Sequence, residues 1–507
     1  MPGSHGDRAV SSVIGELLDL TSLGTEMGRR ASARGVLLLW RAQARSVRRV
    51  LVRDGKTEET HSSTSSGHGV QVFTEEARTA FASRDDFRPE EALRLLDRAI
   101  GSAEGGARLD LHRIQIPPLA PVTARAVPAV VAAFEEVDLR SVARRLAQLE
   151  ADLRGRIPGV RLKVAYAADL EAWRVFRSDG TDVLFAMPRT VLRMTATTSG
   201  DGGRHSVGAS AFAPHPRMPW DEGVVARFLR RAERAARLAL DLPNAPCHPA
   251  GSFPLVIDYA LAKGLAHEAF GHASEADGYR SSVLARDGRF RAGEVVGAGH
   301  VSIVDEPIEG DHAWQPWSVN GVRRERMVIV DHGRLADGLS DPWSAGPGGV
   351  RLTDAARAES FHNAPLPRMS NIRIEVDHPL PAPGDFEAYG PEEVRDLLSS
   401  AGIFRRHDRM VFLSGYSGGQ VNPATGDFVF NCKAIYDLSR DRITLHKPAI
   451  FSGSMFGALS SVREAFGPLR LDALGTCGKW GQSVPSSGGS HYFLALHPDP
   501  TVRLGGA

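Results

Sequence analysis

A short stretch of the chain holds two histidines and a glutamate at a spacing that suits metal chemistry. It reads His267-Glu-Ala-Phe-Gly-His272, so Glu268 directly follows the first histidine. Imidazole nitrogens bind transition metals, and a carboxylate beside such a metal can take a proton from water. We therefore interpret His267 and His272 as metal ligands and Glu268 as the general base of a hydrolytic site.

The two histidines are five residues apart, one more than in the common His-Glu-x-x-His pattern. On a regular α-helix, positions five residues apart point in directions roughly 140° apart, so both rings cannot reach one metal. We therefore expect a locally widened turn at Phe270 and Gly271, as in a π-bulge, or a helix end there. Gly271 would tolerate such a distortion because glycine has no Cβ.

A catalytic zinc usually has three protein ligands, so one ligand must come from elsewhere in the chain. Glu275 and Asp277 lie just downstream of the second histidine, and Cys247 lies in Pro246-Cys-His248. Cys477 lies in Gly475-Thr-Cys-Gly-Lys479, where the glycines would let a thiolate approach a metal and the lysine charge would favour that thiolate. The residues alone leave these candidates open, although Cys477 has the most suitable setting.

The expected helices and strands that must position these residues indicate an α+β protein in two parts. Of the 507 residues, 42% are hydrophobic and 24% charged, as in globular proteins. We expect an α/β N-terminal half, split by a proline-rich loop into subdomains over residues 1–120 and 121–242. A β-rich, glycine-rich catalytic domain is expected over residues 243–507, with the His-Glu helix near its start.

Hydrophobic periodicity and turn residues predict the individual elements. Amphipathic helices are expected at residues 89–103, 139–153 and 222–240. The apolar run at residues 36–40 suits a helix or a strand equally. In the C-terminal half, strands are expected at residues 294–304, 324–331, 371–376, 410–416, 427–436, 442–447 and 491–496.

Composition excludes several classes of protein. The formal net charge of +1 gives no broad field that would favour nucleic acid or a membrane surface as a partner. No apolar run approaches the roughly 18 residues of a membrane span, and the first ten residues lack the apolar core of a signal peptide. Three cysteines in so long a chain predict a reduced, cytoplasmic protein.

Several blocks of the sequence resemble those of the TldD/PmbA family of metallopeptidases. The metal-binding stretch with Glu275 and Asp277 is similar to the family signature, and the catalytic TldD-like subunits are the closer match because PmbA (TldE) partners typically lack it. Further blocks agree in order: Arg357-Ala-Glu-Ser with Pro367-Arg-Met-Ser-Asn371, Gly418-Gly-Gln-Val-Asn-Pro-Ala-Thr-Gly-Asp-Phe-Val-Phe430, and Gly475-Thr-Cys-Gly-Lys479 with Gly481-Gln482 and Val484-Pro485. The resemblance covers residues 45–507.

The resemblance implies a zinc peptidase with His267, His272 and Cys477 as ligands and Glu268 as general base. It also implies unstructured or modified peptides as substrates, an enclosed cavity that receives them, and a dimer. The second subunit would be a PmbA/TldE-like paralogue or a second copy of this chain. A non-catalytic modulator or binding protein is a further hypothesis, which the intact motif disfavours.

Departures from the family pattern bear on the substrate. Ala273 and Ala276 stand where glycines are frequent, Trp480 replaces a small or acidic residue, and residues 486–491 differ from the usual glycine-rich run. These changes lie near the expected metal site and leave the zinc chemistry intact. A hydrolase for a small amide or a dipeptide-like conjugate in a biosynthetic pathway is therefore a second hypothesis.

Two further roles need residues outside the metal motif. A thiolate ligand makes zinc a weaker Lewis acid, so another donor should stabilise the oxyanion. His362, His491 and Tyr492 are candidates for this role or for binding substrate. Gly418 and Gly419 are candidates for backbone contacts to an extended peptide.

Overall fold

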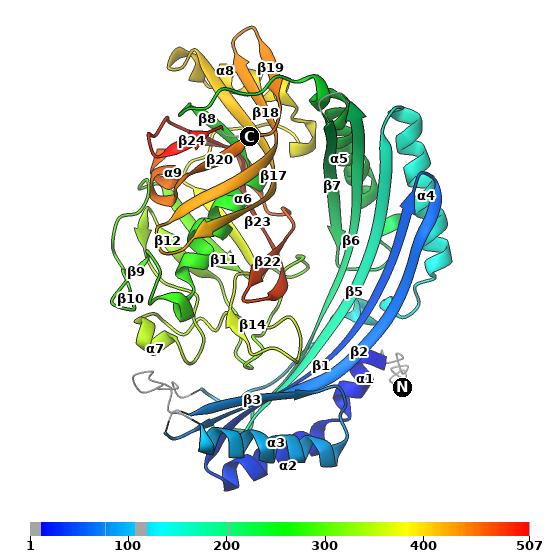
Figure 1. Ribbon diagram of the computed structural model, residues 1–507, viewed down its shortest axis with the longest axis vertical. Helices are drawn as coiled ribbons and strands as arrows, with labels where there is room; N and C mark the ends of the chain where they lie inside the picture. The colour runs from blue at the N-terminus through cyan, green and yellow to red at the C-terminus, as the bar shows by residue number, and fades with distance from the viewer. Residues whose placement is uncertain (1–11, 77, 107–118, 201–202, 506–507) are drawn as a thin grey trace, which may run out of the picture.

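The chain folds into two lobes, a long curved sheet with helices and a second, β-rich lobe that lies along the sheet (Figure 1). This structure is a computed structural model, which describes residues 12–76, 78–106, 119–200 and 203–505. The predicted α+β class, with an α/β N-terminal half and a β-rich C-terminal half, is confirmed. Residues 1–11, which include the segment that argued against a signal peptide, lie outside the described ranges, as does the start of the proline-rich loop.

Seven strands of the described N-terminal half form one antiparallel-dominated sheet in the order β3-β2-β1-β5-β6-β4, with β7 beside β6. Their bounds are β1 (Val36–Arg53), β2 (Lys56–Thr74), β3 (Thr79–Arg84), β4 (Thr123–Ala126), β5 (Arg161–Arg177), β6 (Asp182–Gly200) and β7 (Gly203–Ala213). The ambiguous run at residues 36–40 is the start of a strand. The sheet takes strands from both sides of the proline-rich loop, so the two expected N-terminal subdomains share it.

Helices cover one face of this sheet. They are α1 (Ser12–Leu18), α2 (Thr21–Ala33), α3 (Pro89–Gly105), α4 (Leu139–Arg156) and α5 (Glu222–Asp241). Side chains alternate across each strand. On β5, Leu170 and Ala172 therefore pack in the core beneath the helices, whereas Trp173 and Val175 face the other lobe.

A larger sheet of thirteen strands organises the described C-terminal half. Its order is β13-β12-β11-β16-β23-β8-β17-β18-β20-β24, with β19 beside β18 and with β21 and β22 beside β23. The bounds are β8 (Leu255–Asp258), β11 (Val301–Glu306), β12 (Met327–Asp331), β13 (Arg334–Leu335), β16 (Asn371–Val376), β17 (Arg409–Asn422), β18 (Asp427–Ser439), β19 (Ile443–His446), β20 (Ile450–Ser454), β21 (Val462–Arg470), β22 (Gly475–Lys479), β23 (Gln482–Leu496) and β24 (Val502–Leu504). All the strands predicted for this half overlap observed strands. Six strands of this sheet were not predicted: β8, β13, β20, β21, β22 and β24.

The buried strand β8 lies between β23 and β17 and leads directly into helix α6 (Tyr259–Gly264) and the helical segment η4 (Leu265–Gly271). Asp258 ends the strand and caps α6, because its Oδ1 accepts hydrogen bonds from the backbone N–H groups of Ala260 and Leu261 at 3.1 and 3.0 Å. Its Oδ2 accepts from Gly415 N on β17 at 2.6 Å. One carboxylate therefore fixes the start of the helix against the neighbouring strand.

Buried arginines of the N-terminal sheet join the two lobes. They donate hydrogen bonds to backbone carbonyl groups of one loop in the C-terminal lobe. The contacts are Arg41 Nε to Val319 O at 2.5 Å, Arg177 Nη1 to Asn320 O at 3.1 Å and Arg189 Nε to His312 O at 2.9 Å. An apolar cluster around Trp173 and Phe185 lies at the same interface and includes Val319 and Phe361.

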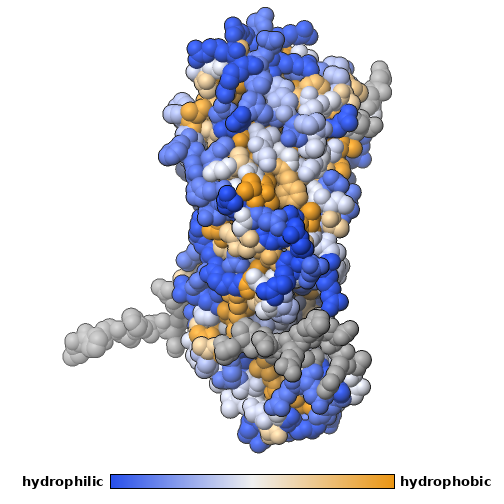
Figure 2. Space-filling model, turned by 90° about the vertical axis from the view of Figure 1, so that its left-hand side faces the viewer, coloured by the Kyte–Doolittle hydropathy of each residue, from blue (hydrophilic) through white to orange (hydrophobic). Residues whose placement is uncertain are grey.

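Among the described residues, no helix is both long and apolar enough to cross a bilayer. Figure 2 shows one side of the C-terminal lobe, where hydrophilic side chains cover the upper end and apolar ones gather in the middle.

Replacing Arg41 tests the contact between the lobes. In Arg41→Met, Val319 O and Asn320 Oδ1, which accepts from Arg41 Nη2 at 2.6 Å, lose a buried donor. An unsatisfied buried polar group costs about 1–3 kcal/mol, so we expect the thermal unfolding midpoint to fall by several degrees. Arg49→Met, at an exposed position of the same strand, should unfold like the parent. Equal midpoints for all three proteins would contradict this account of the interface.

Candidate metal centre

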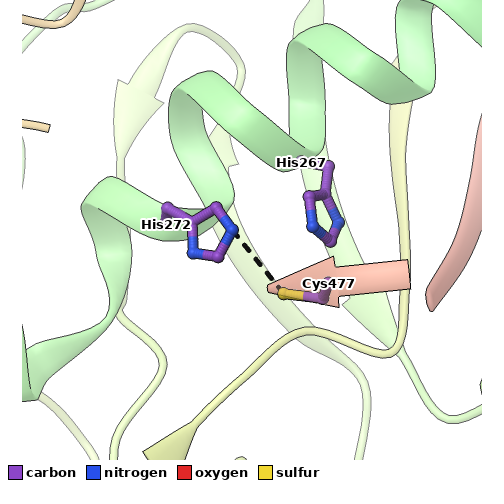
Figure 3. Close-up of side chains that lie close together, drawn as sticks. All are labelled: His267, His272 and Cys477. Atoms are coloured by element: carbon purple, nitrogen blue, oxygen red, sulfur yellow. Dashed lines mark hydrogen bonds between the residues drawn. The ribbon is translucent and has the colours of Figure 1, made fainter. Parts of the chain in front are cut away.

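The segment that carries both histidines, η4, is a π-helix that continues α6. The backbone N–H of His272 donates to the carbonyl oxygen of His267, a bond that spans five residues. A π-helix has more residues per turn than an α-helix, so side chains five residues apart come to the same side. The predicted widening around Phe270 and Gly271 is confirmed, and it turns both imidazoles in one direction (Figure 3).

Packing holds the widened segment in place. Leu265, Ala266, Ala269 and Phe270 are fully buried in the core of the C-terminal lobe. Gly271 is needed for a reason other than the one expected. Its φ of −58° is ordinary helical backbone, but a Cβ there would lie 1.9 Å from the sulfur of Met369. The glycine therefore lets the helix approach its neighbour closely.

Cys477 completes a group of three side chains that could hold a metal. The ligand atoms of His267, His272 and Cys477 all lie within 4.8 Å of one another, and Cys477 Sγ is 3.6 Å from His272 Nε2 (Figure 3). Cys477 lies on β22, which forms a hairpin with β23. Both residues of its turn, Trp480 and Gly481, have positive φ values of 48° and 78°, as a tight two-residue hairpin loop requires.

The donor set fits a metal ion. Two ligands of one tetrahedral zinc lie roughly 3.5 Å apart, close to the distance between Cys477 and His272. His267 Nδ1 is buried and makes no hydrogen bond with the described residues. A buried polar atom without a partner is costly, so a cation that accepts ring lone pairs suits this position.

Electrostatics favour the metal-binding form of two of these groups. Burial, and then the charge of Lys263, hold the pKa of His267 well below its usual range, so the ring is neutral. Burial raises the pKa of Cys477, but His272 and Arg368 outweigh it and the net shift is downward. The thiolate is therefore favoured, as metal binding requires.

His272 behaves differently because it sits between two anionic groups. Burial lowers its pKa, but the charges of Glu275 and Cys477 outweigh burial and raise it well above its usual range. A proton then takes the position that a cation would occupy. Metal binding displaces protons from such ligands, so the same anionic surroundings favour either cation.

Charged residues surround the group in pairs. Glu275 Oε2 lies 3.1 Å from His272 Nδ1, and Lys479 Nζ bridges Glu275 and Asp277 at 2.9 and 2.7 Å. Glu275 and Asp277 are therefore outside the group of candidate ligands. Glu275 instead orients the imidazole, as carboxylates often do beside metals.

Arg368, and not Lys479, is the cation at the thiolate. Its Nε donates to Cys477 Sγ at 3.3 Å, and its Nη2 donates to the carbonyl oxygen of Cys477. The arginine is fully buried. Its block, Pro367-Arg-Met-Ser-Asn371, carries part of the family resemblance, but no role was predicted for the arginine. An arginine within such a block was the only signal in the sequence that pointed to it.

Glu268 lies on the same π-helical segment and contacts the neighbouring strand. Tyr416 on β17 donates its hydroxyl to Glu268 Oε1 at 3.0 Å. A Cβ on Gly264 would lie 2.8 Å from the Tyr416 ring, so glycine at this position lets the ring reach Glu268. No sequence pattern indicated that Tyr416 would lie beside Glu268.

Lys263 is a second residue that the sequence analysis missed. It is buried one turn before His267 and donates to Ser486 Oγ at 3.2 Å. Burial lowers its pKa, and the charges of Glu268 and Cys477 act in the opposite direction.

A cleft with a volume of about 180 Å³ lies beside these residues. Lys263 and Tyr416 line it from the C-terminal lobe, whereas residues 208–210 of β7 and Arg231 of α5 line it from the N-terminal lobe. Both lobes therefore wall this space, and Lys263 and Tyr416 connect it to the metal-binding segment, although none of the three candidate ligands lines it.

Other candidate residues have different surroundings. His362 lies 3.1 Å from Ser83 Oγ and 3.0 Å from Asp85, both of the N-terminal lobe. Both ring nitrogens of His491 bond to backbone, Nδ1 to Gly467 O at 2.7 Å and Nε2 to Val376 N at 3.2 Å. The Tyr492 hydroxyl donates to Gly384 O at 3.2 Å. None of the three is brought to the metal-binding group, and Cys247 is exposed outside it.

Gly418 and Gly419 lie inside β17, two and three residues beyond Tyr416. The pairing register with β18 shifts between Tyr416 and Gly419, and Gly418 has a φ of 106°. The pair therefore forms an irregularity within the strand β17. Their role in peptide binding stays a prediction.

Comparison with known protein families shows that two parts of the chain match domains of metallopeptidases. Residues 250–486 match the C-terminal domain of the PmbA/TldA metallopeptidases, and residues 41–103 match domain 1 of these enzymes. A metalloprotease of Methanocaldococcus jannaschii is 31% identical over 337 residues, which cover 65% of this chain and 67% of the relative. A metalloprotease of Methanothermobacter thermautotrophicus is 28% identical over 451 residues, which cover 87% of this chain and 90% of the relative.

A solved structure has the same fold over nearly the whole chain. TldE from Thermococcus kodakarensis superposes with a TM-score of 0.72, covering 97% of this chain and 100% of that one at 14% identity. At that identity the likeness concerns the fold alone. The sequence matches identify the chain as a metallopeptidase that belongs to the TldD/PmbA family.

Proposed function

We propose that this chain is a zinc-dependent peptidase with His267, His272 and Cys477 as metal ligands and Glu268 as general base. The observation that carries the proposal is the meeting of three ligand atoms within 4.8 Å of one another, two of them from the helical segment that also carries Glu268. Two imidazoles and a thiolate suit zinc better than the oxygen-preferring cations magnesium and calcium.

When bound, zinc would act as a Lewis acid that lowers the pKa of water and polarises a carbonyl group. Glu268 takes the proton of the attacking water and then passes it to the leaving amine. Tyr416 holds one carboxylate oxygen by its hydrogen bond and leaves the other available for the proton. Burial, together with the Glu268 charge, raises the Tyr416 pKa, so the hydroxyl remains a donor.

Lys263 is the donor that we propose for the negative charge that develops on the substrate. Its charge interacts with those of Glu268 and Cys477, and its side chain lines the cleft. Fixed charges in a site that excludes water act strongly on a developing oxyanion. This proposal replaces His362, His491 and Tyr492, whose polar atoms bond elsewhere.

A paired assembly is part of the proposal. The fold is shared with TldE of Thermococcus kodakarensis, and family membership supports a partnership of a TldD-like chain with a TldE-like one. Unstructured peptides would then enter a space that this chain and its partner enclose. A homodimer is the other form that we consider.

A second candidate function is hydrolysis of a small amide or a dipeptide-like conjugate. The cleft favours it, because about 180 Å³ is small beside the roughly 300–1,000 Å³ of common ligand pockets. Supplying unfolded peptides and dipeptide amides in parallel, with and without a TldE-like partner, separates the two. Faster turnover of the long peptides supports the peptidase proposal, and turnover of dipeptide amides alone supports the second function.

Substitution of Glu268 tests its role as base. Glu268→Gln keeps the shape of the side chain but cannot accept the proton, so we expect peptide hydrolysis to fall by roughly 10²–10⁴-fold. Metal content should stay that of the parent. Glu392→Gln, at an exposed position of helix α8 (Pro391–Ser400), is the matched control and should retain full activity. Undiminished hydrolysis by Glu268→Gln would remove Glu268 from the mechanism.

Substitution of Cys477 tests the third ligand. Cobalt(II) bound to a thiolate shows a charge-transfer absorption band, which we expect in the parent and in Cys247→Ser but not in Cys477→Ser. Loss of a residue that hydrogen-bonds to a metal ligand costs roughly 10–100-fold in metal affinity. Loss of the ligand itself should therefore cost at least as much. Chelator competition measures this for zinc. A charge-transfer band that persists in Cys477→Ser would assign the thiolate ligand to another cysteine.

A further inference from the structure

A second cluster of metal-binding side chains lies outside the candidate metal centre. His248, Asp437 and His446 each offer one ligand atom, and these atoms all lie within 4.8 Å of one another. Both histidines are buried. The cluster joins the segment before β8 to the strands β18 and β19, and the proposed peptidase mechanism uses none of its members.

Strand pairing brings Asp437 and His446 together. In the antiparallel pair of β18 and β19, Ile435 lies opposite His446 and Asp437 lies opposite Thr444. Asp437 and Ile435 are two residues apart and face the same side of the sheet, so Asp437 is a diagonal neighbour of His446. His446 Nε2 lies 3.2 Å from Asp437 Oδ2.

The third member arrives on a segment that is anchored to the same strands. The backbone N–H of Lys447 donates to Pro246 O at 2.9 Å, which fixes the segment beside the end of β19. His248 then packs its ring on Phe253, with centroids 4.9 Å apart, and Nε2 lies 3.4 Å from Asp437 Oδ1. The two imidazole rings are 4.8 Å apart.

The hydrogen bond at Nδ1 of His248 determines whether Nε2, which faces Asp437, carries a proton or a lone pair. Nδ1 lies 2.8 Å from Pro249 O, and a carbonyl oxygen can only accept, so this nitrogen carries the proton of the neutral ring. Nε2 then presents a lone pair to the carboxylate of Asp437, and two acceptors face each other. A cation between them removes the repulsion. Metal-binding histidines are commonly oriented by such a bond from the other ring nitrogen to a backbone carbonyl.

His446 supplies an independent sign of a missing partner. Its ring is nine-tenths buried, and neither ring nitrogen makes a hydrogen bond with the described residues, although Nε2 lies within ion-pair distance of Asp437 Oδ2 at 3.2 Å. Arg409 approaches Asp437 Oδ2 at 3.7 Å while it stacks on Phe253, so part of the carboxylate charge is already balanced. Arg409 makes no hydrogen bond with either ring nitrogen of His446.

We propose that His248, Asp437 and His446 bind a divalent transition-metal ion of the zinc class as a structural site. Two imidazoles and one carboxylate form a ligand set that zinc accepts. The ion fastens the segment before β8 to the strands β18 and β19. β8 runs directly into α6 and η4, which carry the candidate metal ligands His267 and, at the end of η4, His272. The proposed ion therefore anchors the segment that leads into the candidate metal centre.

Cobalt(II) titration of the full-length, metal-free protein distinguishes the two sites. Cobalt in the candidate metal centre has a thiolate ligand and shows a charge-transfer band, whereas cobalt at His248, Asp437 and His446 shows only ligand-field bands. We expect the parent to bind two equivalents, of which one develops the charge-transfer band. Metal analysis after loading with zinc should give the same stoichiometry.

Variants assign the second equivalent. His446→Gln and, separately, His248→Gln should each lose the equivalent without the charge-transfer band and keep the one with it. His407→Gln is the matched control, because His407 belongs to another pair of neighbouring rings, with His497 at 5.3 Å, and should bind two equivalents. The retained charge-transfer band shows in the same sample that each variant is folded.

The stoichiometry decides the proposal. One equivalent in the parent, with all of it showing the charge-transfer band, would overturn it and leave a proton as the cation that the cluster holds. Two equivalents in both His446→Gln and His248→Gln would also overturn it. Because the charge-transfer band reports on a thiolate ligand, which the cluster of His248, Asp437 and His446 lacks, failure of the peptidase proposal and failure of this one give different spectra.

Discussion

Two imidazoles that are five residues apart can face one point only where the helix that carries them is widened. In this protein the widening is a π-helical segment with a backbone bond from His272 to His267, and the rest of the site depends on it. A π-helical segment is rarely stable alone, so it must be held by the burial of its apolar side chains in the surrounding core. The central strand β8 leads into it, β17 brings Tyr416 to its carboxylate, and the β22–β23 hairpin brings Cys477 from 205 residues beyond His272.

Charge pairing is the second constraint at the centre. Anions and cations alternate through a buried network, so that each charge has an opposite neighbour: Arg368, Cys477, His272, Glu275, Lys479 and Asp277. Removing one member of such a network leaves a buried charge without its partner, which costs far more than the pair contributes. The network therefore fixes the orientation of the ligands even before any metal binds, and it keeps the thiolate and the imidazole at the distance that a metal needs.

Local sequence patterns predicted much of this structure. Spacing alone predicted the distorted turn between His267 and His272, and alternation predicted the strands at residues 371–376 and 427–436. Contacts between distant segments carried no such local signal. The hydroxyl of Tyr416 reaches Glu268 only because two strands and a helix assemble, and Arg368 reaches Cys477 across 109 residues. Gly271 was expected to serve the backbone, yet its neighbour Met369 is what requires a glycine, and that neighbour is visible only in the folded chain.

The arginines that join the lobes bind backbone carbonyl groups at residues 312, 319 and 320, and only Arg41 adds a bond to a side chain of this loop, that of Asn320, among the described contacts. A carbonyl oxygen is present whatever residue occupies the position. Sequence drift along this loop can therefore change side chains without removing those hydrogen bonds, provided that the path of the backbone is kept. The two walls of the cleft would hold their spacing in relatives that share little sequence here, so that new specificities could arise on a frame whose dimensions do not change.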